Sequence, residues 1–193
     1  MVILGITGGI GSGKSTISEI FRLMDIPVYI ADAESKKLTA TSPVIREKLI
    51  KEFGEDLYEG NVLNKALLAS YIFNDKDKLG KTNKIIHPEV NKHFHLWVEK
   101  HKDVPLVAAE AAILYESGMD RYMDKIAVVF TPLEERIKRV MARDNSPREK
   151  IMQRISNQMS DEEKMKRADY IIYNDETKSL IRQSINIISH ITQ

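Results

Sequence analysis

The sequence contains no cysteine, which excludes disulfide bonds, thiolate metal sites and cysteine catalysis and agrees with an expected cytoplasmic location. It also lacks a strong charge of one sign, because 29 basic and 28 acidic side chains among 193 residues leave a net charge of +1. Proteins that bind nucleic acid or membrane surfaces through charge are usually basic, so neither partner is expected. No apolar run approaches the length of a membrane span, and we expect no signal peptide because Met1 opens directly into a strand-like run.

What the sequence does contain is a glycine-rich segment at residues 8–16, which reads GGIGSGKST. Its spacing, G-x-x-x-x-G-K-S, is that of the phosphate-binding P-loop. Residues 1–7 before it are apolar and β-branched, as in a buried strand, and residues 15–24 after it have apolar side chains at helical spacing. The alternative is a strand-to-helix turn without a ligand, but such a turn does not need the Lys-Ser ending.

The residues of this loop predict its chemistry. Glycines let backbone N–H groups approach an anion closely, and the N-terminus of the following helix adds a partial positive charge. Lys14 is expected to reach the β- and γ-phosphates of a nucleotide, and the Ser15 hydroxyl to ligate Mg²⁺. The predicted nucleotide-binding residues of the loop are Gly11, Ser12, Gly13, Lys14, Ser15 and Thr16.

Short apolar runs that alternate with helical patterns predict an α/β fold, a single domain over residues 1–193 built on a five-stranded, doubly wound parallel sheet. The expected strands lie at residues 1–7, 26–31, 105–110, 125–131 and 168–173. Residues 42–101 are mainly helical in pattern, apart from a polar break at residues 74–78, and exceed the length that a crossover needs. We expect them to form an inserted lobe that binds the second substrate.

Acidic residues at two predicted strand ends are candidates for catalysis, because the carboxyl ends of parallel strands line the ligand crevice. Asp32 follows the second strand and is a candidate general base, although it would equally well N-cap the next helix. Glu110 ends the third strand, where a carboxylate can hold a magnesium-bound water. His87, next to Pro88, is by its own context better explained as a structural histidine near a helix kink.

Residues 132–158 predict an arginine-rich helical hairpin. Thr131 and Ser146 each precede a proline and, three positions on, a glutamate, which is the pattern of a capped helix start. The arginines expected on one face of the first helix are Arg136, Arg139 and Arg143. In many small P-loop kinases such a hairpin forms a lid over the transferring phosphate. The alternative is a solvated helix face whose arginines pair with nearby acids.

Seven segments, spread over nearly the whole chain, together resemble the dephospho-CoA kinase family. They are ITGGIGSGKST at 6–16, AD at 31–32, IHP at 86–88, ILYESG at 113–118, RVMARD at 139–144, RISNQ at 154–158 and ADYIIYN at 168–174. The resemblance implies a P-loop fold of the nucleoside-monophosphate-kinase type. It also implies that ATP, with Mg²⁺, phosphorylates the ribose 3′-hydroxyl of dephospho-CoA to give coenzyme A and ADP. The sequence does not indicate an oligomeric state.

The resemblance also implies roles for individual residues. Asp32 would take the proton from the 3′-hydroxyl, Arg139 and Arg143 would bind the ATP phosphates, and Asn174 would approach the adenine base. The residues implied near the acceptor are His87, Tyr115 and Glu116, with Asp32. The residues expected to carry catalysis are Asp32, Lys14 and Arg139. The positions that depart from the family pattern are Ile30 in place of an aspartate, Ala112 in place of a proline and Arg136 in place of a lid glutamine.

Three rival functions compete with this interpretation on the residues alone, although one of them, a GTPase, lacks its motifs. A P-loop kinase for another small hydroxyl-bearing metabolite would keep the loop and the lid. A GTPase would need Asp-x-x-Gly, which occurs only at residues 77–80 in an unsuitable setting, and Asn-Lys-x-Asp, which is absent. A non-catalytic nucleotide-binding module would not need an acid at position 32.

Overall fold

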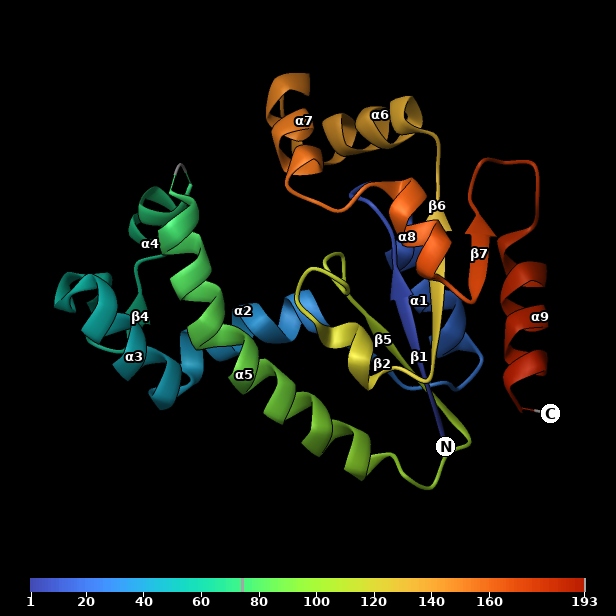
Figure 1. Cartoon of the computed structure of the whole chain (residues 1–193), viewed down its shortest axis with the longest axis horizontal. Coiled ribbons are helices and arrows are strands. Elements are labelled where there is room, and N and C mark those ends of the chain that lie inside the picture. The colour runs from blue at the N-terminus through green and yellow to red at the C-terminus, as the bar shows by residue number, and fades with distance from the viewer. Residues whose placement is uncertain (74, 193) are drawn as a thin grey trace. The chain divides into compact units, whose positions relative to one another are not determined.

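The computed structural model describes residues 1–73 and 75–192, and the chain divides into two compact units. The first unit combines Met1–Ile30 with Val98–Gln193, and the second is Ala31–Trp97 (Figure 1). Each unit is built around its own apolar core. Among the described residues, no helix is both long enough and apolar enough to span a membrane.

The first unit is built on a parallel sheet of five strands, in the order β2-β5-β1-β6-β7. The strands are β1 Val2–Thr7, β2 Val28–Ile30, β5 Leu106–Glu110, β6 Lys125–Phe130 and β7 Tyr170–Tyr173. All five residues of β5 are buried, as expected for a strand that is covered on both faces. The predicted α/β fold with a five-stranded parallel sheet is confirmed.

The central position of β1 explains why its loop can become a site. Glu110 at the end of β5 pairs in register with both Ile6 of β1 and Ile30 of β2. On the other side, Thr7 of β1 pairs with Val128 of β6. Since all the strands run in the same direction, the segments that follow them leave the sheet at one edge, where ligands bind in folds of this kind.

Helices cover the sheet of the first unit, and one of them, α1, directly follows the glycine loop. They are α1 Lys14–Leu23, α6 Leu133–Asp144, α7 Arg148–Ser156, α8 Asp161–Arg167 and α9 Leu180–Thr192, with a short 3₁₀ turn, η2, at Met119–Tyr122. Ile17 and Phe21 of α1 and Ile187 of α9 join residues of β1 in one buried apolar cluster. The expected caps of the hairpin are wrong: α6 and α7 start after Pro132 and Pro147, and neither N-terminus has a side-chain cap.

The second unit is mainly helical. It contains α2 Ala31–Thr41, α3 Pro43–Phe53, a 3₁₀ turn η1 at Glu55–Leu57, β3 Tyr58–Glu59, β4 Val62–Leu63, α4 Lys65–Ile72 and most of α5 Lys76–Lys100. Its core is formed around Ile45, Leu49 and Leu57, which are fully buried. The antiparallel β3–β4 pair was not expected from the sequence.

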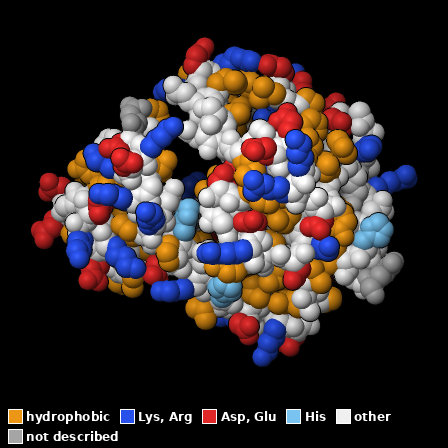
Figure 2. All heavy atoms as spheres, viewed as in Figure 1, with side chains coloured by type: hydrophobic (Ala, Val, Ile, Leu, Met, Phe, Trp, Pro, Cys, Tyr) orange, Lys and Arg blue, Asp and Glu red, His pale blue; other side chains and the backbone are white. Residues whose placement is uncertain are grey.

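Helix α5 starts earlier than its apolar pattern predicts. Of the expected polar break at 74–78, Asn74 lies outside the described residues, and Lys76–Lys78 already belong to the helix. Asp75 accepts a hydrogen bond from Lys78 N at 2.9 Å, so its carboxylate satisfies a donor at the start of α5. Over the face in Figure 2, basic and acidic side chains are intermixed, in keeping with the balanced composition.

Candidate active site

The glycine loop joins β1 to α1 at the edge of the sheet where the strands end. Gly13 is the N-cap of α1 with φ 94° and ψ 21°, a left-handed conformation that favours glycine. A Cβ at this position would overlap Nδ2 of Asn174, so the absence of a side chain is also required for packing. Ser15 and Thr16 are exposed in the first turn of α1, where backbone N–H groups and the helix dipole favour an anion.

Lys14 folds back over the loop that precedes it. Its Nζ donates hydrogen bonds to Gly8 O at 3.0 Å and to Gly9 O at 3.2 Å, and the residue is only 8% exposed. The ammonium group is therefore held within the loop itself. Phosphate oxygens are stronger acceptors for an ammonium group than neutral carbonyls, so a bound polyphosphate can compete for it.

Ser12 is fixed by two side chains that come from the ends of other strands. Its carbonyl accepts a hydrogen bond from Asn174 Nδ2 at 2.8 Å. The Thr131 hydroxyl lies 2.9 Å from the same carbonyl and 3.0 Å from Asn174 O, and can donate its one proton to either. The sequence pattern assigned this hydroxyl to the cap of α6, but it instead ties the ends of β6 and β7 to the glycine loop.

Arg139 extends from α6 toward the same place. Its Nη1 lies 3.5 Å from Thr131 Oγ1 and its Nη2 lies 3.4 Å from Asn174 O. These distances are at the limit of hydrogen bonding, so the guanidinium is held weakly and can turn toward another acceptor at little cost. Lys14 and Arg139 thus both lie against the glycine loop, Lys14 at Gly8 and Gly9 and Arg139 beside Gly13.

The other arginines of the hairpin have acidic partners. Arg143 Nε lies 2.7 Å from Asp144 Oδ1, and Arg154 Nη1 lies 2.8 Å from Asp144 Oδ2. These hydrogen bonds, first from Arg143 and then from Arg154, hold the pKa of Asp144 well below its usual range. Arg148 of α7 forms two 2.7 Å hydrogen bonds with the carboxylate of Glu134 in α6. The alternative of arginines paired with nearby acids therefore describes Arg143, Arg148 and Arg154.

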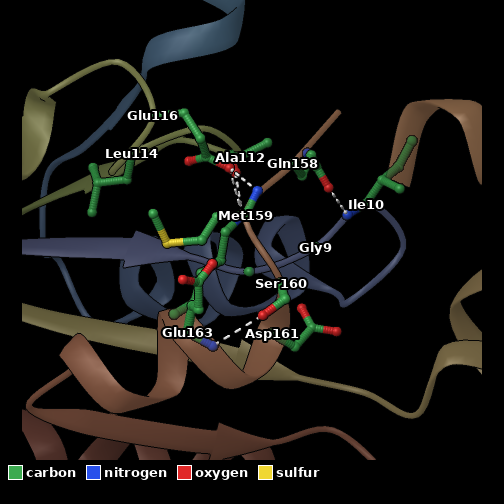
Figure 3. Close-up of polar contacts among 12 residues, drawn as sticks. Gly9, Ile10, Ala112, Leu114, Glu116, Gln158, Met159, Ser160, Asp161 and Glu163 are labelled. Atoms are coloured by element: carbon green, nitrogen blue, oxygen red, sulfur yellow. Dashed lines mark hydrogen bonds and ion pairs between the residues drawn. The ribbon is translucent and has the colours of Figure 1, made fainter. Parts of the chain in front are cut away.

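The segment after β5 carries Glu110 and two residues expected near the acceptor. Glu110 is 7% exposed at the end of its strand. The hydroxyl of Tyr115 is buried, and burial, followed by the charge of Asp120, raises the pKa of this tyrosine to about 12. Glu116 accepts a hydrogen bond from Met159 N at 2.7 Å and pairs with Lys164 Nζ at 3.2 Å (Figure 3). Tyr115 and Glu116 are thus packed within the first unit.

Asp32 and His87 lie in the second unit. Helix α2 begins at Ala31, so Asp32 lies inside its first turn with an exposed side chain, which contradicts the alternative that it N-caps this helix. It follows β2 by two residues along the chain. His87 is half-buried in α5, and burial lowers the pKa of its imidazole, which favours the neutral form. Pro88 follows it inside the same helix.

Sequence reasoning missed Thr131, Gln158 and Asp161 as contacts of the glycine loop. Thr131 could have been found by its place directly after a strand, which is the signal that singled out Asp32. Gln158 accepts a hydrogen bond from Ile10 N at 3.0 Å, and Asp161 pairs with Arg136 at 3.0 Å. These two contacts join residues far apart in the sequence, and no local pattern indicates them.

Comparison with known proteins agrees with this arrangement. The family model described as dephospho-CoA kinase matches residues 2–179. A dephospho-CoA kinase of Bacteroides fragilis is 49% identical over 191 residues, which cover 98% of this chain and 93% of the relative. A solved structure from Thermus thermophilus is 33% identical with a TM-score of 0.86, over 100% of this chain and 98% of that one. The dephospho-CoA kinase structure from Campylobacter jejuni is 25% identical with a TM-score of 0.73, over 98% of this chain and 96% of that one. The chain therefore belongs to the dephospho-CoA kinase family.

Proposed function

We propose how the residues described above divide the work of one reaction, the ATP-dependent phosphorylation of dephospho-CoA to coenzyme A, which is the activity of this family. The observation that carries the assignment is that Lys14 Nζ contacts the glycine loop at Gly8 and Gly9 while the Arg139 guanidinium lies beside Gly13, at the N-terminus of α1. Two cations beside exposed helix N–H groups form a site for a polyphosphate.

ATP binds with its phosphates along residues 11–16, and Lys14 exchanges the carbonyls of Gly8 and Gly9 for phosphate oxygens. Arg139 turns from its weak contacts toward the γ-phosphoryl group, where its charge stabilises the transition state. Asn174 supports the loop through Ser12, and its placement on the adenine side follows from the family resemblance. Arg143 joins the phosphates only if it leaves Asp144, which we propose as part of closure of the 132–158 lid.

The residues present fit a magnesium ion. The Ser15 hydroxyl is exposed in the first turn of α1, and the carboxylate of Glu110 ends the strand adjacent to β1. Among the described residues, no group of three or more acidic or imidazole side chains could enclose a metal by itself. Mg²⁺ in kinases commonly has few protein ligands and is completed by water and phosphate oxygens, so a hydroxyl and one carboxylate would suffice to hold it. When bound, the ion neutralises negative charge on the β- and γ-phosphates.

Asp32 acts as the general base. The acceptor oxygen of the ribose 3′-hydroxyl forms a bond to the γ-phosphorus, the bond from this phosphorus to the β-phosphate oxygen breaks, and ADP leaves. The proton of the hydroxyl passes to the Asp32 carboxylate, whose exposed position permits contact with a substrate.

Residues 42–101 bind the acceptor, with His87 neutral as a hydrogen-bonding group. The family resemblance implies that Tyr115 and Glu116 lie near the acceptor.

Mass spectrometry of the reaction products tests this function. The protein is incubated with Mg·ATP and either dephospho-CoA or a panel of other hydroxyl-bearing metabolites. We expect coenzyme A and ADP in equal amounts from dephospho-CoA, and no comparable product from the panel. Preferred phosphorylation of another acceptor would replace the substrate, and ATP binding without any product would favour a non-catalytic module. A cytoplasmic location, where ATP is abundant, is part of the proposal.

A further inference from the structure

Arg136 does not share the surroundings of the other arginines on α6. Its side chain is 5% exposed, whereas that of Arg143 is 60% exposed. Helical spacing predicted Arg136 on one face with Arg139 and Arg143, but the structure buries Arg136 together with Ile137 and Val140. The buried face of α6 therefore includes a guanidinium group, and such a charge needs a partner.

The partner of Arg136 is Asp161, in the first turn of α8. Nη2 lies 3.0 Å from Oδ2 and Nη1 lies 3.2 Å from Oδ1, so the two groups form a two-pronged ion pair. The pair lies directly against Gly9, because a Cβ built on Gly9 would overlap Nη1 and would lie 3.1 Å from Asp161 Oδ1. A side chain at position 9 would therefore require the guanidinium of Arg136 to move.

Gln158, three residues before Asp161, holds Ile10, the loop residue that follows Gly9. Its Oε1 accepts a hydrogen bond from Ile10 N at 3.0 Å (Figure 3). The following residue, Met159, donates its N–H to Glu116. Glu116 also pairs with Lys164, which is fully buried and donates to Ala112 O at 3.0 Å. The segment 158–161 is thus anchored to the polypeptide after β5, and it holds Gly9 and Ile10 from that anchor.

We propose that Arg136, Gln158 and Asp161 are positioning residues, which hold Gly9 and Ile10 in the backbone conformation that binds the phosphates of ATP. Glycine-rich backbone loses much conformational freedom on ordering, so contacts that order the loop before ATP arrives reduce the free-energy cost of binding. These residues act on the affinity for ATP and leave the transfer step unchanged. The inference rests on the proposed function only in that the glycine loop binds ATP.

The sign of the effect of Asp161→Asn separates positioning from simple electrostatics. Removing a negative charge near a triphosphate should strengthen ATP binding if charge alone matters. Positioning predicts the opposite: the affinity falls about tenfold if loss of the ion pair leaves the binding conformation roughly one-tenth populated. Gln158→Ala, which removes the hydrogen bond to Ile10 N and leaves the ion pair in place, is expected to change the affinity in the same direction.

Glu162→Gln is the matched control. Glu162 is the neighbour of Asp161, is exposed and lies in the same first turn of α8, so its substitution removes the same charge from the same helix N-terminus. The Arg136–Asp161 ion pair is left intact in this variant. We expect Glu162→Gln to bind ATP within about twofold of the wild type, the range of a weak exposed charge effect.

The experiment is calorimetric titration of each variant with Mg·ATP in the absence of acceptor, followed by kcat at saturating ATP with dephospho-CoA. We expect weaker ATP binding in Asp161→Asn and Gln158→Ala, with kcat within about twofold of the wild type. Unchanged or tighter binding in both variants, an equal loss in Glu162→Gln, or a loss confined to kcat would overturn the inference. If Asp161→Asn does not fold, Gln158→Ala decides alone. ATP binding by a wild type that fails to phosphorylate dephospho-CoA would contradict the proposed function and leave this inference standing.

Discussion

Replacing Thr131 by valine tests whether its hydroxyl holds the glycine loop. Valine has nearly the same shape, and the residue is fully buried, so the substitution removes the hydroxyl and leaves the packing. Ser12 O keeps the hydrogen bond from Asn174 Nδ2, while Asn174 O is left with only the 3.4 Å contact to Arg139. Leaving a buried acceptor poorly satisfied costs about 1–3 kcal/mol, and the half-buried Asn174 O is expected toward the lower end of that range. For a chain of this length, each kcal/mol corresponds to a decrease in Tm of roughly 2–4 °C.

The assay is thermal unfolding of Thr131→Val beside Thr41→Val. Thr41 is exposed and its hydroxyl donates only to Lys37 O of its own helix, so its replacement is expected to change Tm by less than about 2 °C. We also expect Thr131→Val to weaken ATP binding, since Ser12 is part of the loop. Equal Tm values for the two variants, together with unchanged ATP affinity for Thr131→Val, would refute the reasoning.

Three further predictions concern single groups. Lys14→Ala should lose phosphoryl transfer while remaining folded, measured by activity and Tm together; near-wild-type turnover would remove Lys14 from the mechanism. Arg139→Ala should lower kcat by about 10³–10⁵ with a much smaller effect on ATP affinity. The control Arg22→Ala, at an exposed position, should leave kcat unchanged. A raised KM with unchanged kcat in Arg139→Ala would make Arg139 a ground-state ligand. Because burial lowers the pKa of His87, the unfolded chain binds its proton more readily, so stability should fall as the pH drops below the ordinary value of 6.5. This loss should be at most about 1.4 kcal/mol per pH unit, and an unchanged slope in His87→Gln would exclude His87 as its source.

The strand–loop–helix unit could be predicted because its signals are local. Apolar runs, the glycine spacing and the position of Lys14 all lie within 24 residues, and β1, the loop and α1 agree with them. Asp32 was found from its place after a strand, although the helix boundary that decided against a capping role was not visible in the sequence. Element boundaries depend on tertiary context more than element types do.

The contacts behind the loop could not be predicted because local patterns compete with tertiary ones. Thr131 has the pattern of a helix cap, but its hydroxyl contacts Ser12, 119 residues away. Arg136 shares a helical face with Arg139 by spacing, and only the docking of α6 determines that one is buried and the other half-exposed. Gln158 reaches Ile10 across 148 residues, which no periodicity encodes.

The most direct test of the account is the rate of Asp32→Asn with saturating ATP and dephospho-CoA. Asparagine keeps the size of the Asp32 side chain and removes its basicity. The matched control is Asp77→Asn, because Asp77 is an exposed residue in the first turn of α5 and its replacement also removes one charge from a helix start. If Asp32 is the base, its variant should keep its Tm and ATP affinity and lose about 10²–10⁴ of the rate, while Asp77→Asn stays near the wild type. An Asp32→Asn enzyme with nearly full activity would contradict the assignment and leave Glu110 as the next candidate.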